Sequence, residues 1–160
     1  MSRYTIRTVT KADKNWVIRS HVEHYQNEYG FDDSFAVLCR EIVDSFLTNR
    51  NPVAEQGWIA EENGVAVGCI FCVRYAKDTA QLRLFYLVKE ARGHGLGKRL
   101  LQTCMQFAKQ AGYSDMRLWT HQSHTAATGL YRAQGWRCDG SEEKESFGTN
   151  EVVETYVYRF

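Results

Sequence analysis

The sequence has few of the features that mark membrane, secreted or nucleic-acid-binding proteins. Its longest apolar runs are far too short to span a membrane, and no hydrophobic signal segment follows Met1. The formal net charge is only +1, so no overall basic field argues for a nucleic-acid partner. No internal repeat, linker or low-complexity segment interrupts the 160 residues. We therefore expect a single domain over residues 1–160, with neither a membrane nor a nucleic acid as partner.

The cysteines do not form the pattern of a disulfide framework. There are five of them, an odd number, and they are widely scattered, which is typical of a reducing compartment and predicts a cytoplasmic protein. Cys69 and Cys72 spell C-x-x-C inside an apparent strand, where residues three apart point to opposite faces. No second pair could complete a zinc site. We expect buried structural cysteines and no metal.

The spacing of apolar residues changes along the chain and predicts eleven elements. The first helix is stopped by Gly30, the second is capped by Asp32-Asp33-Ser34, and the only proline, Pro52, lies in the connection that follows. The expected order is strand 3–9, two helices on either side of Gly30, strands 57–61, 65–75 and 80–88, a helix from 96 to about 111, strand 116–120, helix 125–134, and strands 136–141 and 152–160. This order, β-α-α-β-β-β-α-β-α-β-β, predicts an α/β fold in which helices flank a mixed sheet. A polar loop holding Ser146-Phe147-Gly148 is expected between the last two strands.

The most informative stretch is Arg92-Gly93-His94-Gly95-Leu96-Gly97, which follows an apolar strand and precedes an amphipathic helix. A strand, a glycine turn and a helix together present backbone N–H groups and a helix N-terminus to a phosphate. Glycine tolerates positive φ and lets a ligand approach the backbone closely. Arg92 adds a fixed positive charge. The stretch therefore predicts that residues 93–98 hold a pyrophosphate.

The spacing of the glycines narrows the choice of ligand. G-x-G-x-G is one residue short of the dinucleotide fingerprint, and Gly97-Lys98 is followed by Arg99 instead of the Ser or Thr of a P-loop. The stretch resembles the R/Q-x-x-G-x-G/A signature of the GNAT acyl-CoA N-acyltransferases. A second run, Ala127-(x)2-Leu130-Tyr131-(x)3-Gly135-Trp136, is similar to that family's A-x-x-L-Y-x-x-x-G-F signature, with Trp in place of Phe. The predicted element order is also the one that the GNAT fold shows.

Further stretches resemble a GNAT subgroup that is often fused behind a MarR-type winged-helix regulator. They are Tyr25-(x)2-Glu28-Tyr29-Gly30, Leu118-Trp119-Thr120 and Ser146-Phe147-Gly148. The acyltransferase fold takes up the 160 residues, so DNA binding is not carried over. Three departures concern the acceptor side: His124 and His121 stand where asparagines are usual, and Lys144-Glu145 replaces a pair of histidines. The acceptor therefore stays open.

The resemblance implies acetyl-CoA as donor and a primary amine of a small molecule as acceptor, joined by direct attack in a ternary complex. In GNATs the pantetheine arm pairs with the fourth strand and the glycine loop holds the pyrophosphate. Carried over to this chain, the cofactor-binding residues are Phe85, Tyr86, Leu87, Arg92, Gly93, His94, Gly95, Leu96, Gly97, Lys98 and His124. Two alternatives remain open, namely a protein or peptide acceptor and a non-catalytic acyl-CoA sensor. Dimers are common in the family, so a homodimer is also expected.

The same resemblance suggests catalytic and acceptor-binding residues. Tyr131 matches the family's tyrosine, and a phenol with a pKa of about 10 stays protonated and can donate to a leaving thiolate; a simple core tyrosine is the alternative. Glu28 is the expected general base, although it could be a solvated carboxylate, with His121 or His124 taking the role. The expected walls of the acceptor pocket are Tyr25, Tyr29, Trp119 and Phe147, and core packing explains these aromatic residues equally well.

Overall fold

A seven-stranded mixed sheet runs through residues 3–160, which are the residues that the computed structural model describes. Its strands are β1 (Tyr4–Thr8), β2 (Gln56–Glu62), β3 (Val65–Ala76), β4 (Thr79–Leu87), β5 (Asp115–His121), β6 (Arg137–Ser146) and β7 (Thr149–Arg159). The helices are α1 (Lys14–Tyr29), α2 (Asp33–Asn49), α3 (Leu96–Gln110) and α4 (Thr125–Ala133). The spatial order of the strands is β1-β2-β3-β4-β5-β7-β6. The α/β fold class and the order of elements are as the sequence predicts.

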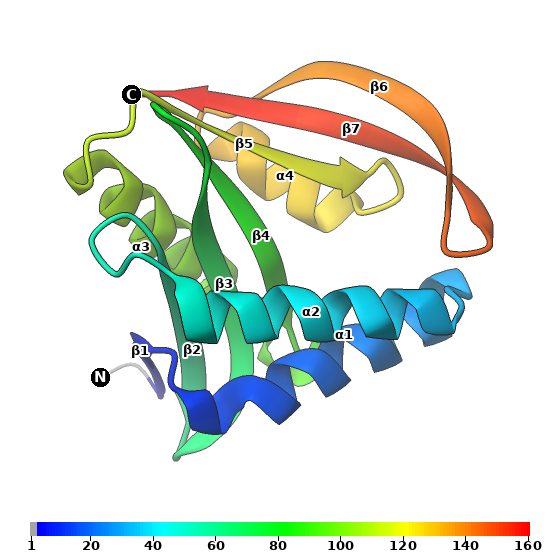
Figure 1. Ribbon diagram of the computed structural model, residues 1–160, viewed down its shortest axis with the longest axis horizontal. Coiled ribbons are helices and arrows are strands. Elements are labelled where there is room, and N and C mark those ends of the chain that lie inside the picture. Colours follow the sequence, from blue (N-terminus) through cyan, green and yellow to red (C-terminus); the bar gives the residue numbers. More distant parts are fainter. Residues whose placement is uncertain (1–2) are drawn as a thin grey trace.

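The helices divide between the two faces of the sheet (Figure 1). On one face, α1 and α2 bury Val17, Val43 and Phe46 against Phe71 of β3. On the other face, α3 and α4 pack with alternate residues of the same strands, such as Cys72. This alternation follows from the two-residue period of a strand. Within residues 3–160, no helix is both long and apolar enough to cross a lipid bilayer.

Local signals set the boundaries of the two N-terminal helices. Gly30 adopts φ 66° at the C-terminus of α1, a conformation that favours glycine. Asp32 caps α2, and its side chain accepts a hydrogen bond from the Ser34 amide at 3.0 Å. The C-x-x-C pair also behaves as expected, because Cys69 and Cys72 are both buried and belong to the cores on opposite faces.

The sheet opens between β4 and β5. These parallel strands pair only from Thr79–Gln81 to Asp115–Arg117, after which β5 continues alongside β7 while β4 has no partner on that side. A bulge adds to the separation: Arg83 pairs with Phe71 and Tyr86 with Cys69, so two residues of β4 stand opposite a single residue of β3. Leu84, at the bulge, has φ 54°. The open wedge exposes the C-terminal half of β4.

The last two strands are longer than the sequence analysis expects. β6 and β7 form one hairpin up to Ser146 and Thr149, so the expected polar loop of residues 142–151 is in fact strand and a tight turn at Phe147-Gly148. Both turn residues have positive φ, 52° and 84°. The hairpin tip lies beside the segment that joins α1 and α2 (Figure 1), and the Asp32 amide donates to the Phe147 carbonyl at 2.8 Å. The hairpin therefore bridges the open side of the sheet.

Candidate active site

The glycine loop presents a row of free amide groups. Gly93 and Gly95 have φ 81° and 76°, and Gly95 is the residue from which α3 begins. None of the six amide groups from Gly93 to Lys98 donates a hydrogen bond to another described residue, and the first to do so is that of Arg99, to Gly95. Unpaired amides at a helix N-terminus attract anions. The loop has the form expected of a pyrophosphate cradle.

Gly97 holds the loop close to the sheet. A β-carbon there would lie 3.3 Å from Leu87 Cδ1 and 3.4 Å from Leu130 Cδ2, closer than most side-chain contacts. The missing side chain therefore lets the first turn of α3 pack tightly against both β4 and α4. Consequently the free amides stand beside the exposed end of β4.

Arg92 has a partner that the sequence does not indicate. Its Nε and Nη2 atoms donate to the Leu87 carbonyl at 3.1 and 3.0 Å, at the last residue of β4. Its positive charge also acts on the other side of the wedge, where it lowers the pKa values of His24 and His124. Arg92 therefore ties the glycine loop to the strand that the resemblance assigns to the pantetheine arm.

Four of the five histidines of the chain gather at the wedge, and we call them the histidine cluster: His21, His24, His121 and His124. The first two come from α1, and the others from the end of β5 and the start of α4. The rings of His121 and His124 stack at 5.3 Å, and the ring of Tyr29 lies 4.8 Å from that of His124. The helix α1 and the C-terminal end of β5 thus bring together residues a hundred positions apart.

Burial keeps the histidine cluster neutral near pH 7. Burial lowers the pKa of His21 to about 4, and the pKa of His124 also falls to about 4 through burial and the nearby positive groups. The pKa values of His24 and His121 are lowered as well, again mainly by burial. A neutral imidazole can accept a proton, so these side chains are in the form that a general base requires.

Several ring nitrogens of the cluster have no partner. Among the described residues, buried side-chain atoms without a hydrogen bond include His21 Nε2, His121 Nδ1 and His124 Nε2. His124 Nδ1 lies 3.1 Å from Thr120 Oγ1, while His121 Nδ1 is 4.0 Å from the nearest Glu151 carboxylate oxygen. Buried polar atoms in native proteins usually have partners. The free nitrogens therefore point to water or a ligand as the missing partner.

Tyr131 lies on the face of α3 and α4, buried to 4% exposure. Its ring is near those of Phe85, Trp136 and Tyr156, with centroid distances of 6.3, 5.8 and 5.9 Å. The hydroxyl has no hydrogen-bond partner among the described residues, and burial raises the pKa of the phenol well above its ordinary value. The side chain is both part of the core and a protonated donor beside β4, so its catalytic role stays a prediction.

The structure brings some of the expected acceptor residues together and separates others. Tyr25 and Tyr29 contact the histidine cluster, and Phe147 at the hairpin tip packs on Phe31, whose ring lies 5.5 Å from that of His121. Trp119 does not join them, since it is 40% exposed and its ring contacts Tyr75.

Glu28 also lies outside the cluster proper. It is exposed in the last turn of α1, although its charge raises the pKa of His24 against the lowering effect of burial.

The convergence of His24 with His124 was not among the sequence predictions, because nothing in the local spacing joins α1 to the end of β5. Within residues 3–160, no group of three or more His, Cys, Asp or Glu is placed to hold a metal ion.

The chain resembles known proteins both in sequence and in structure. The model of the acetyltransferase (GNAT) family matches residues 17–136. N-acetyltransferase 8 of Mus musculus is 38% identical over 106 residues, which cover 62% of this chain and 45% of that protein. The human N-acetyltransferase 8 is 32% identical over 111 residues, with 64% and 48% covered. The chain therefore spans about half the length of these curated relatives.

Solved structures share the fold over nearly the whole chain. The ribosomal-protein-alanine N-acetyltransferase from Brucella melitensis has a TM-score of 0.82 at 21% identity, covering 98% of this chain and 99% of that one. The Salmonella typhimurium protein yncA, described with its cofactor acetyl-CoA, has a TM-score of 0.83 at 18% identity, with 99% and 94% covered. At these identities the likeness establishes the fold.

Proposed function

Because this chain belongs to the acetyltransferase (GNAT) family, we propose that it transfers the acetyl group of acetyl-CoA to a primary amine of a small molecule, by direct attack in a ternary complex. In this reaction the N–C bond forms, the C–S bond of the thioester breaks, the amine gives up a proton and the sulfur gains one. The observation that carries the proposal is the row of six unpaired amides beside the open end of β4.

The residues around the glycine loop fit acetyl-CoA. Its pyrophosphate matches the free amides of residues 93–98, which lie at the N-terminus of a helix. Its extended pantetheine arm matches residues 85–87, which have no strand beside them on the β5 side. When bound, acetyl-CoA supplies an activated acetyl group. Binding of the arm along β4 would compete with Arg92 for the Leu87 carbonyl, so the Arg92 side chain is expected to move towards the phosphates.

The amine must lose its proton before it can attack, and two kinds of side chain can take that proton. His124 is neutral and partly buried, and its Nε2 atom is buried without a partner among the described residues. Glu28, the base that the family resemblance suggested, lies at the solvent side of the same cluster and acts on His24 electrostatically. A proton accepted within the cluster can therefore leave towards Glu28 and bulk water. The Tyr131 hydroxyl then donates a proton to the departing sulfur, because this phenol stays protonated and has no hydrogen-bond partner among the described residues.

A small acceptor is favoured over a protein by the closed end of the site. The hairpin tip is held to the start of α2 by the 2.8 Å hydrogen bond between the Asp32 amide and the Phe147 carbonyl. The Phe147 ring packs at 5.0 Å from Phe31 and 5.1 Å from Phe35. An extended polypeptide would have to displace this contact, whereas a small amine would not.

The proposal is tested by a charge placed in the glycine loop. Gly95→Asp puts a carboxylate among the free amides, and we expect affinity for CoA to fall by at least about tenfold, since like charges repel at close range. Gly64→Asp is the matched control: Gly64 has nearly the same φ, 78°, and equally open surroundings, but lies in the β2–β3 turn. Titration calorimetry with CoA measures the effect.

The complementary measurement is thiol release from acetyl-CoA in the presence of amino acids, polyamines, aromatic amines and peptides. Release with a small amine is expected. Equal CoA affinity in the two Asp variants would contradict the assignment of the loop. Tight CoA binding without thiol release from any amine would leave the protein as an acyl-CoA sensor.

A further inference from the structure

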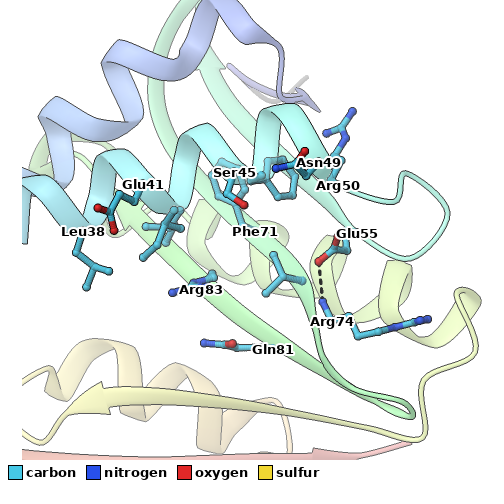
Figure 2. A pocket seen from close by; sticks show the side chains of 14 residues that line it. Leu38, Glu41, Ser45, Asn49, Arg50, Glu55, Phe71, Arg74, Gln81 and Arg83 are labelled. Atoms are coloured by element: carbon cyan, nitrogen blue, oxygen red, sulfur yellow. Dashed lines mark hydrogen bonds between the residues drawn. The ribbon is translucent and has the colours of Figure 1, made fainter.

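A hollow of about 360 Å³ lies between α2 and strands β3 and β4, on the same face of the sheet as the histidine cluster. Its walls include the apolar side chains of Leu38, Phe46 and Phe71, and Arg83 of β4 lies on its floor (Figure 2). Arg83 directly precedes the bulge at Leu84. The hollow is therefore adjacent to the place where β4 leaves β5.

Arg83 has no partner of opposite charge. Within residues 3–160 its guanidinium makes no ion pair and no hydrogen bond, and the side chain is partly buried, which lowers its pKa. Partial burial removes some of the water that would otherwise stabilise the charge, so an anion that enters the hollow would stabilise it further. The planar guanidinium is also the group best suited to bind a carboxylate through two parallel hydrogen bonds.

The two carboxylates that line the hollow do not neutralise Arg83. Glu55 accepts a hydrogen bond from the backbone amide of Arg74 at 3.0 Å (Figure 2). It accepts another from the backbone amide of Asn51 at 3.2 Å. Glu41 lies exposed on α2. Neither carboxylate contributes to the pKa of Arg83, on which the only other influence beside burial is Cys39. The positive charge in the hollow therefore remains available for a ligand.

The register of the sheet places Arg83 on the acceptor side of the reaction site. Arg83 pairs with Phe71 and Tyr86 with Cys69, and these two β3 residues belong to the same core cluster, so Arg83 and Tyr86 lie on one face. The ring of Tyr86 is 5.2 Å from that of His24. The guanidinium of Arg83 and the Tyr86 ring, which contacts His24 of α1, thus follow one another along the same face of β4.

The other side of the wedge offers an apolar surface. Gln81 pairs with Arg117 at the last parallel pair, so the next positions on this face are Arg83 on β4 and Trp119 on β5. Trp119 is 40% exposed, and its ring contacts that of Tyr75. The indole therefore lies on the β5 side of the opening, outside the walls of the hollow.

We propose that Arg83 binds the carboxylate of the acceptor, so that the acceptor is an amino-acid-like molecule with its primary amine close to a carboxylate. This inference rests on the proposed function, since it names the substrate class of the same site. The carboxylate pairs with Arg83, and the amine lies towards the histidine cluster. The carboxylate itself takes no part in the chemistry.

The test compares amino acids with their own amides and with the corresponding decarboxylated amines, using kcat/KM for thiol release. The wild-type protein should prefer the acids. Arg83→Gln should remove about 10- to 100-fold of that preference, mainly through KM, because a charged hydrogen-bonded pair is lost. Arg83→Lys should retain part of the preference. Arg74→Gln is the matched control, since its guanidinium lies at the same hollow but over the ring of Tyr113, at 5.6 Å.

A second measurement separates this inference from the proposed function. Calorimetry on the CoA-bound protein reads binding of the acids without turnover, and CoA affinity should be the same in every Arg83 variant. If kcat/KM is the same for the acids and for their amides, or if Arg83→Gln keeps the preference for the acids, the inference is overturned and the proposed function stands. Arg83-dependent binding of acids without acetylation would overturn the function and keep the anion site. Neither binding nor acetylation would overturn both.

Discussion

Acid should unfold this protein in part through His21. The side chain is only 3% exposed, its Nδ1 atom is 2.8 Å from the Val17 carbonyl, and its Nε2 atom has no partner among the described residues. The ring faces Tyr86 at 5.6 Å, and the nearby His24 further opposes a second positive charge. The backbone of Val17 and Leu84 favours a proton on the ring, but burial outweighs both and the pKa is lowered. A proton on His21 would therefore be a buried charge without a counterion, which folding disfavours.

The size of the effect follows from the two pKa values. The pKa of His21 is about 4 in the folded protein and 6.5 in the unfolded chain, so the unfolded chain binds more protons between these values. Stability is then highest above pH 6.5 and falls as the pH falls towards 4. At pH 5 the loss assigned to His21 is about 2 kcal/mol of unfolding free energy, and at pH 4 and below it approaches about 3 kcal/mol.

Urea unfolding followed by tryptophan fluorescence at pH 7 and pH 5 measures this loss. Between these pH values, wild-type protein should lose about 2 kcal/mol more than His21→Leu, whose side chain cannot titrate. His94→Leu serves as control, because His94 lies exposed in the glycine loop. An equal pH dependence in wild type and His21→Leu would refute the reasoning, whatever the absolute stability of the variant.

Three further predictions concern the reaction itself. Tyr131→Phe removes only the unpaired hydroxyl and should lower thiol release by at least about tenfold without changing CoA affinity; a fully active variant would exclude the phenol as donor. His124→Gln should reduce kcat/KM for the amine more than Glu28→Gln, because Glu28 lies exposed; the reverse order across a pH profile would make Glu28 the base. Phe147→Ala should lower the unfolding free energy by about 2 kcal/mol, measured by thermal unfolding, and should raise KM for the amine. A loss of CoA affinity with an unchanged KM for the amine would contradict a role of the hairpin on the acceptor side.

The elements that the sequence predicts well are those with local causes. A glycine at positive φ ends α1, and an aspartate caps α2. Each of these signals lies within a few residues of the structure that it determines. The glycine loop is of the same kind, since its strand, turn and helix follow one another directly along the chain.

The features that the sequence did not indicate depend on distant contacts or on unusual conformations. Leu84 adopts positive φ, which leucine rarely does, so no turn residue marks the bulge in the sequence. At the hairpin tip Gly148 marks a loop, but Phe147, also at positive φ, gives no sign of how tight the turn is. The charged residues 142–145 lack the alternation of a half-buried strand because β6 is exposed along nearly all of its length. The sequence gives no sign that Arg83 is more than a charged strand residue, because the hollow that it lines is formed with α2, which is distant in the chain.

The glycine loop and the acceptor side use different parts of the polypeptide. In the proposed function, donor recognition relies on main-chain amides, which a change of side chain at His94 or Lys98 leaves in place. In the same proposal, acceptor recognition relies on side chains such as Arg83, which can be replaced alone. A protein engineer could therefore diversify the acceptor positions in a library while every member keeps the same donor, so that selection would explore new amines from a constant source of acetyl groups.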